Sequence, residues 1–135
     1  MRRWAAPLLV TLLASVAAGA AGDAASRHVP AGTWGGLHAV LEVEEQGARI
    51  EYDCAHGTLD GALALDAEGR FAVAGSHTSE RGGPVHEGQE PPSRPARYTG
   101  SLRGDTLTLT LALDGETVGT FTLKRGENGR LVKCQ

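Results

Sequence analysis

The chain is 135 residues long and carries 13 lysines and arginines against 16 aspartates and glutamates, a formal net charge of −3. A mildly acidic chain without a basic stripe is a poor candidate for binding nucleic acid or an anionic membrane surface. Glycine accounts for 19 residues. Glycines that recur between short apolar runs, as they do here, are typical of β-strands joined by turns.

Residues 1–21 have the pattern of a secretory signal peptide. Two arginines precede an apolar run from Trp4 to Ala20, and its small final residues offer several cleavage sites. The run is short for a membrane span, although an uncleaved N-terminal anchor is the alternative. We therefore expect a periplasmic or secreted protein with no membrane insertion after cleavage. A lead segment at 22–33 would precede a single domain at 34–135.

The chain contains two cysteines, Cys54 and Cys134. In the oxidising compartment that export implies, two cysteines usually pair, so a disulfide is expected. It would close a loop of about 80 residues and contribute at most roughly 4–5 kcal/mol on the chain-entropy estimate. For one small domain that is a large share of the net stability.

Period-2 alternation of apolar and polar residues predicts eight short strands, at 37–44, 49–54, 62–65, 70–75, 97–104, 106–113, 120–125 and 130–134. In 106–113 the leucines face inward and the threonines outward. The same alternation points Leu37 and Cys54 inward. Strict alternation leaves one face buried, and closure removes exposed sheet edges. We therefore expect an all-β fold, a small, lipocalin-like antiparallel barrel of about eight strands that is closed by the disulfide. A β-sandwich is the alternative.

Residues 76–97 interrupt this regularity. They contain four prolines and three glycines, mixed charges and no apolar period. Loops of this length inside compact domains are usually functional or disordered. We expect a long loop, either disordered or forming a lid at the mouth of the barrel.

The stretch DCAHG offers three chemical readings. A Cys54 nucleophile with His56 as its base is disfavoured, because the cysteine is expected to be oxidised. A metal site of His38, Asp53 and His56 would form if the first two strands pair through the turn near Gln46. Alternatively, His38 is solvated and His56 bonds its own turn.

Hydrolase chemistry finds no support in the sequence, which has no G-x-S-x-G elbow and no carboxylate pair at a fixed glycosidase separation. We expect no enzyme, no resident cofactor, and a monomer that binds an unknown small molecule or protein. Trp34 either plugs one end of the barrel or stacks on a ligand. The candidate binding residues are Trp34, His38, Asp53, His56, His77, Glu80, His86 and Tyr98.

Two resemblances add to this reading. The stretches WGGLH, IEYDCAHG, GRF, GGP and ARYTG, with a cysteine near the end, are similar to a group of small exported bacterial β-barrel proteins of uncharacterised function. That similarity implies no activity.

More loosely, YDC at 52–54, ARYTG at 96–100 and KCQ at 133–135 resemble the inhibitors of C-type lysozyme, which are small eight-stranded barrels. This resemblance implies that Tyr98, Thr99 and the preceding loop enter a lysozyme cleft. Two departures weaken it: the chain has an extra N-terminal strand bearing Trp34, and SRP at 93–95 replaces the Ser-Gly of the inhibitors.

Overall fold

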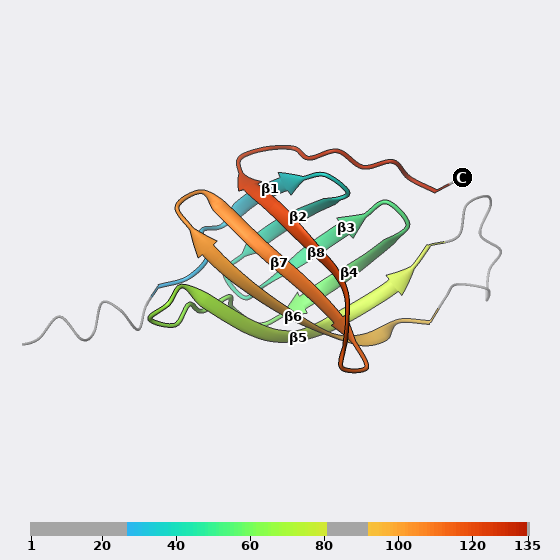
Figure 1. Ribbon diagram of the computed structural model, residues 1–135, viewed down its shortest axis with the longest axis horizontal. Coiled ribbons are helices and arrows are strands. Elements are labelled where there is room, and N and C mark those ends of the chain that lie inside the picture. The colour runs from blue at the N-terminus through green and yellow to red at the C-terminus, as the bar shows by residue number, and fades with distance from the viewer. Residues whose placement is uncertain (1–26, 81–91, 135) are drawn as a thin grey trace, which may run out of the picture.

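In the computed structural model, which describes residues 27–80 and 92–134, eight antiparallel strands form a closed barrel (Figure 1). Each strand pairs with its neighbours in sequence, and the last strand closes on the first. The strands are β1 (Gly32–Gly36), β2 (Ala39–Glu44), β3 (Gly47–Tyr52), β4 (Ala55–Asp60), β5 (Arg70–Ser79), β6 (Arg94–Arg103), β7 (Thr106–Leu113) and β8 (Glu116–Arg125). The predicted all-β barrel is therefore confirmed.

The barrel interior is filled by the apolar side of each strand. On β7 the four leucines are at most 8% exposed, while the threonines between them face the outside. The largest fully buried side chains are Trp34, Tyr98, Leu41, Ile50, Leu59, Leu63, Leu107, Leu109 and Leu123. No helix in the described ranges is long and apolar enough to cross a membrane.

Two of the predicted strands are wrong, and two others take their places. Residues 62–65 and 130–134 form no strand, only an isolated bridge at Ala64 and another at Arg130. Leu63 and Leu65 are buried because this extended segment packs over one end of the barrel. β4 escaped prediction because its inward positions hold Ala55, Gly57 and a single leucine, a weak apolar signal.

The predicted loop at 76–97 is wrong at both ends. Residues 76–79 continue β5 and residues 94–97 begin β6, with His77 paired to Arg94. The strands extend here without an apolar alternation, which is why the sequence pattern ended early. Residues 81–91, which include the candidate His86, lie outside the described residues.

The disulfide between Cys54 and Cys134 is present, with the two Cα atoms 5.2 Å apart. It joins the β3–β4 turn to the segment after β8, not to a final strand. Cys54 is exposed, contrary to its predicted inward position, because it lies in the turn where the chain leaves β3. Leu37 is likewise 66% exposed, since the chain turns at His38, whose φ is +69°.

The two ends of the barrel are built differently. At the end we call the closed end, residues 27–31 and 61–66 lie across the opening. Val29 N–H donates to Leu63 O (3.0 Å), and Leu65 N–H donates to Arg27 O (2.9 Å). Part of the expected lead segment therefore belongs to the barrel, and β1 begins at Gly32.

At the opposite end, which we call the open end, the turns after β1, β3 and β7 lie together with the end of β5 and the start of β6. Residues 126–134, the C-terminal strap, run from the end of β8 along the top of the view in Figure 1 towards this end. Arg130 N–H donates to Gly36 O (2.9 Å), and His38 N–H donates to Arg130 O (2.8 Å). The strap is thus hydrogen-bonded to the β1–β2 turn before it reaches the disulfide.

Candidate functional site

The open end holds a cavity of about 390 Å³, which we call the mouth pocket. Its volume lies at the small end of the range of roughly 300–1,000 Å³ that is usual for small-molecule sites. It is lined by His38, Tyr52, Asp53, Cys54, Ala55, His77, Ser79, Leu111, Leu113, Val118 and Phe121. Five strands and two turns therefore contribute to one cavity.

His77 is a polar side chain at a position where the barrel pattern calls for an apolar one. Phe71 faces the interior of the barrel, so by the two-residue period of β5 His77 also faces inward. Its ring lies 5.7 Å from that of Tyr52, centroid to centroid. Its Nδ1 is buried and has no hydrogen-bond partner among the described residues. A buried polar atom without a partner calls for an explanation, such as a missing ligand or water.

Two aromatic rings accompany His77 in the lining of the pocket. Tyr52 and Phe121 lie 5.0 Å apart, centroid to centroid, with their planes tilted by 44°. Tyr52 is 6% exposed, and its hydroxyl also has no partner among the described residues. The nearby hydroxyl of Tyr98 donates to Ser76 O at 2.8 Å. Burial, together with the Tyr98 hydroxyl, raises the pKa of Tyr52 far above its usual range, so this phenol stays protonated.

The electrostatics of the pocket favour an uncharged interior. Burial lowers the pKa of His77, and the neighbouring Arg94 and His56 lower it further, so the neutral imidazole is favoured. The apolar part of the wall includes Leu111 and Leu113, which are buried, and Val118, which is 53% exposed at the rim.

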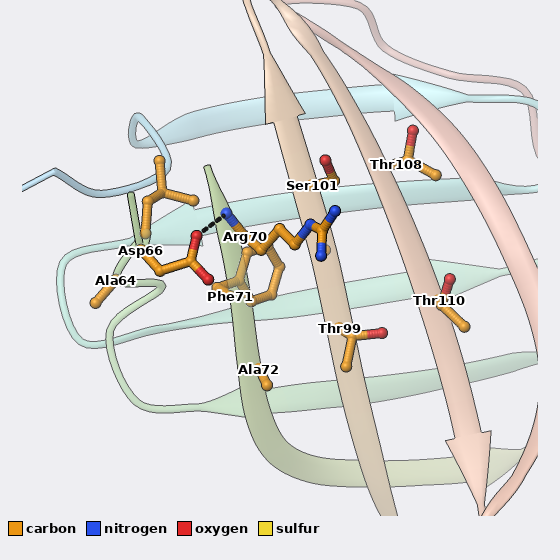
Figure 2. A pocket seen from close by; sticks show the side chains of 11 residues that line it. Ala64, Asp66, Arg70, Phe71, Ala72, Thr99, Ser101, Thr108 and Thr110 are labelled. Atoms are coloured by element: carbon orange, nitrogen blue, oxygen red, sulfur yellow. Dashed lines mark hydrogen bonds between the residues drawn. The ribbon is translucent and has the colours of Figure 1, made fainter. Parts of the chain in front are cut away.

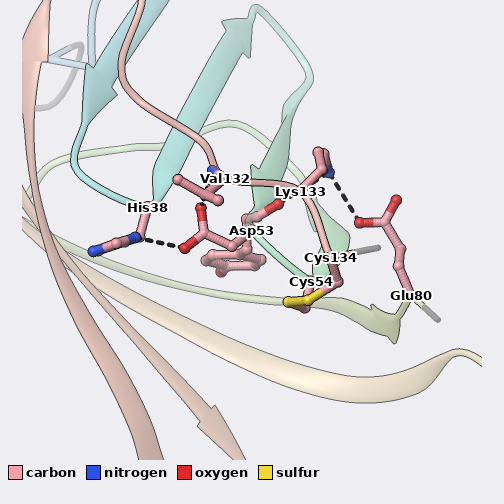
Figure 3. The surroundings of a disulfide bond; sticks show 8 residues. His38, Asp53, Cys54, Glu80, Val132, Lys133 and Cys134 are labelled. Atoms are coloured by element: carbon pink, nitrogen blue, oxygen red, sulfur yellow. Dashed lines mark hydrogen bonds and ion pairs between the residues drawn. A yellow bond between two sulfur atoms is a disulfide. The ribbon is translucent and has the colours of Figure 1, made fainter. Parts of the chain in front are cut away.

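Asp53 connects the rim of the pocket to the C-terminal strap (Figure 3). Its Oδ2 pairs with His38 Nδ1 at 2.5 Å, and its Oδ1 accepts the Val132 N–H at 2.8 Å. Its backbone oxygen accepts the Cys134 N–H at 3.2 Å. The Val132 N–H, followed by His38 and Lys133, holds the pKa of this carboxyl below its usual value. Both carboxylate oxygens are therefore already engaged.

Lys133 secures the same part of the strap. Its Nζ donates to the Tyr52 backbone oxygen at 3.0 Å and to Glu80 Oε2 at 2.9 Å, and Glu51 lies at 3.4 Å (Figure 3). Next to the disulfide, Lys133 thus fixes the strap to β3 and to Glu80, the residue that follows β5.

The structure divides the predicted site residues into groups. His38, Asp53 and His77 line the mouth pocket. Trp34 and Tyr98 are 0% exposed, so neither contacts a ligand or a partner at the surface. Trp34 instead fills the core, as its plugging role required.

The remaining two candidates face each other away from the pocket. His56 Nδ1 lies 3.6 Å from Glu80 Oε1. β2 and β3 pair through the turn at 45–46 as expected, which brings His38 to Asp53, but His56 does not join them. No group of three or more histidine, cysteine, aspartate or glutamate side chains is placed to hold a metal ion within residues 27–80 and 92–134.

Sequence reasoning missed most of the pocket wall. The leucines of β7 were predicted to face inward, but the sequence does not show that two of them lie at an open end. Ser79 and the inward direction of His77 were missed because 76–97 was read as a loop. Continuing the two-residue period of RFAVAG into SHTS would have found both.

A second hollow, of about 680 Å³, lies on the outer face of the barrel beside β5, β6 and β7 (Figure 2). It displays the hydroxyls of Thr99, Ser101, Thr108 and Thr110 next to Arg70. Threonine is common on the exposed face of strands. None of the lining side chains is a buried polar group without a partner among the described residues, so we place the candidate site at the mouth pocket.

No protein-family model, curated protein or solved structure matches this chain.

Proposed function

We propose that the protein is an exported, non-enzymatic β-barrel that binds a small ligand in the mouth pocket. The disulfide is compatible with an oxidising compartment, and the N-terminal sequence has the pattern of an export signal. Eight-stranded barrels are wide enough either to be filled by side chains or to hold one small ligand. Here residues 27–31 and 61–66 lie across the closed end, and the mouth pocket lies at the open end.

The observation that carries the proposal is the unpartnered Nδ1 of His77 inside an aromatic pocket. A buried polar group without a partner costs about 1–3 kcal/mol of stability. A ligand with a hydrogen-bonding group at this position would remove that penalty, and its apolar part would contact the leucines of β7. This combination of an apolar wall with a few inward-facing polar groups is typical of small-molecule sites.

The pocket supports binding better than catalysis. Among the described residues that line it, the hydrogen-bonded side-chain pair is His38 and Asp53, and the Ser79 hydroxyl bonds to neither pocket histidine. No nucleophile is therefore paired with a base. The lysozyme-inhibitor alternative relied on Tyr98, Thr99 and the preceding loop. Tyr98 is buried in the core, Thr99 is exposed, and residues 81–91 of the loop lie outside the described residues. We therefore do not propose it.

A native mass spectrum of the exported, purified protein tests the proposal. The matched variants are Ser79→Trp, which places a bulky ring at the rim of the pocket, and Thr99→Trp, which places one on the outer face. We expect the wild type and Thr99→Trp to carry an adduct or to bind added small aromatic molecules, and Ser79→Trp to do neither. Equal binding by both variants, or no binding by the wild type, would contradict the proposal.

A further inference from the structure

We propose that the ligand of the mouth pocket is a small, uncharged, single-ring aromatic molecule with one hydroxyl group, which hydrogen-bonds to His77 Nδ1. This inference rests on the proposed function and deepens it by naming the chemical class. It follows from three properties of the pocket: the rings that line it, its charges and its unpartnered atom.

The rings favour an aromatic guest. Tyr52 is tilted by 44° to Phe121 and by 52° to His77, and all three residues line the cavity. Aromatic rings prefer such offset or tilted neighbours to a flat sandwich. A fourth ring in the cavity would find both kinds of contact, with Leu111 and Leu113 beside it. The volume of about 390 Å³ is sufficient for one ring.

The charges favour a neutral guest. The carboxylate of Asp53 is engaged by His38 and the Val132 N–H, and Arg94 pairs with Asp114 at 2.5 Å. Arg94 and His56, together with burial, also disfavour a positive charge on His77. A carboxylate or ammonium ligand would lose its hydration without meeting a free opposite charge, which is costly.

The unpartnered atom selects a hydroxyl. A hydroxyl both donates and accepts, so it satisfies Nδ1 in either tautomer of the neutral imidazole. A plain hydrocarbon ring would leave Nδ1 without a partner and retain the cost of burying it.

Four single-ring probes separate these alternatives in a calorimetric titration of the full exported protein. They are p-cresol, toluene, benzoate and benzylamine. We expect p-cresol to bind about tenfold more tightly than toluene, the difference that one hydrogen bond supports. The two charged probes should bind more weakly than either.

A matched pair of variants assigns the hydrogen bond to its atom. His77→Phe keeps a ring in the pocket and removes Nδ1, whereas His56→Phe makes the same change on the outer face of the next strand. His77→Phe should erase the preference for p-cresol over toluene, and His56→Phe should keep it. If His77→Phe fails to fold, nuclear Overhauser contacts between p-cresol and the methyl groups of Leu111 and Leu113 in the wild type decide the position instead.

The outcomes distinguish the two levels of the proposal. Binding of benzoate or benzylamine as tight as that of p-cresol, or an unchanged preference in His77→Phe, overturns the ligand class and leaves a mouth-pocket binder in place. If none of the four probes binds and the native protein carries no adduct, both the class and the proposed function fail.

Discussion

The two ends of this barrel treat buried polar groups in opposite ways. At the closed end, Trp34 is fully buried and its Nε1–H donates to Pro30 O at 2.9 Å, so its polar atom is satisfied. At the open end, Tyr52 is almost as buried, but its hydroxyl and the Nδ1 of His77 have no partner among the described residues. The buried indole N–H at the closed end is hydrogen-bonded, whereas two buried polar atoms at the open end are not.

This difference teaches that burial alone does not identify a site. Trp34 and Tyr98 are the largest fully buried side chains, and both hydrogen-bond to backbone oxygens. The mouth pocket differs because two of its polar atoms, the Tyr52 hydroxyl and His77 Nδ1, are buried without a partner among the described residues. Mutations at the closed end should therefore reduce stability, and mutations at the open end should reduce binding.

The largest effect is expected for Trp34→Ala at the closed end. Truncating a fully buried tryptophan should lower the free energy of unfolding by about 3–5 kcal/mol, because it leaves a cavity in the core. Urea denaturation followed by circular dichroism measures the loss. The open-end control Phe121→Leu should cost less, since Phe121 is only partly buried and keeps an apolar side chain. Equal losses at both ends would break the distinction.

The second-largest effect is expected for removal of the disulfide. The double variant Cys54→Ser with Cys134→Ser should lower the free energy of unfolding by about 2–4 kcal/mol, since the unfolded chain regains the freedom of a long loop. The closed-end hydrogen bonds between residues 27–31 and 61–66 should survive in the folded state. Amide exchange should therefore accelerate in the C-terminal strap and not at Val29 or Leu65. Faster exchange at the closed end instead would show that the two ends are not independent.

Alkaline pH should act through the two tyrosines, Tyr52 and Tyr98, which are the only ones in the chain. Burial raises the pKa of both phenols in the folded state. Their contribution to stability is therefore complete below the unfolded value of about 10 and is lost as the pH rises above it. Tyrosinate absorbance should appear together with unfolding. Ionisation of either tyrosine in a protein that is still folded would show that the interior admits water.

The smallest effect is expected for Asp53→Asn. The substitution removes the charge that faces His38 and weakens the acceptor of the Val132 N–H, so hydrogen exchange at the Val132 amide should accelerate. A matched control exists at the closed end, where Asp66 Oδ1 accepts the N–H groups of Glu68 and Arg70, each at 2.9 Å. Asp66→Asn should leave exchange at Val132 unchanged. The same acceleration in both variants would mean that Asp53 has no local role.

Much of the fold could be predicted from the sequence, because inward and outward residues alternate strictly where both strand faces have clear roles. β7 shows this best, with its leucines inside and its threonines outside. The strand prediction failed where the alternation has another cause and where it is too weak to be recognised. Leu63 and Leu65 alternate because they cover the closed end, and β4 carries too few large apolar residues to be recognised.

The candidate site was only partly accessible for a related reason. His38, Asp53 and His56 were expected together from the pairing of two strands, and the structure brings together only His38 and Asp53. A pocket, however, depends on which residues lie at an open end, and that depends on the register of all eight strands. His77 faces inward because β5 continues to Ser79, and residues 76–79 carry no apolar alternation that would mark them as part of the strand.

The most direct test of the contrast between the two ends is a methyl-group nuclear magnetic resonance titration of the exported protein with p-cresol. The account predicts shifts at the methyl groups of Leu111, Leu113 and Val118 at the open end, and none at those of Val29, Leu63 and Leu65 at the closed end. Shifts confined to the closed end would contradict it, and so would the absence of shifts at both ends up to the solubility limit of p-cresol.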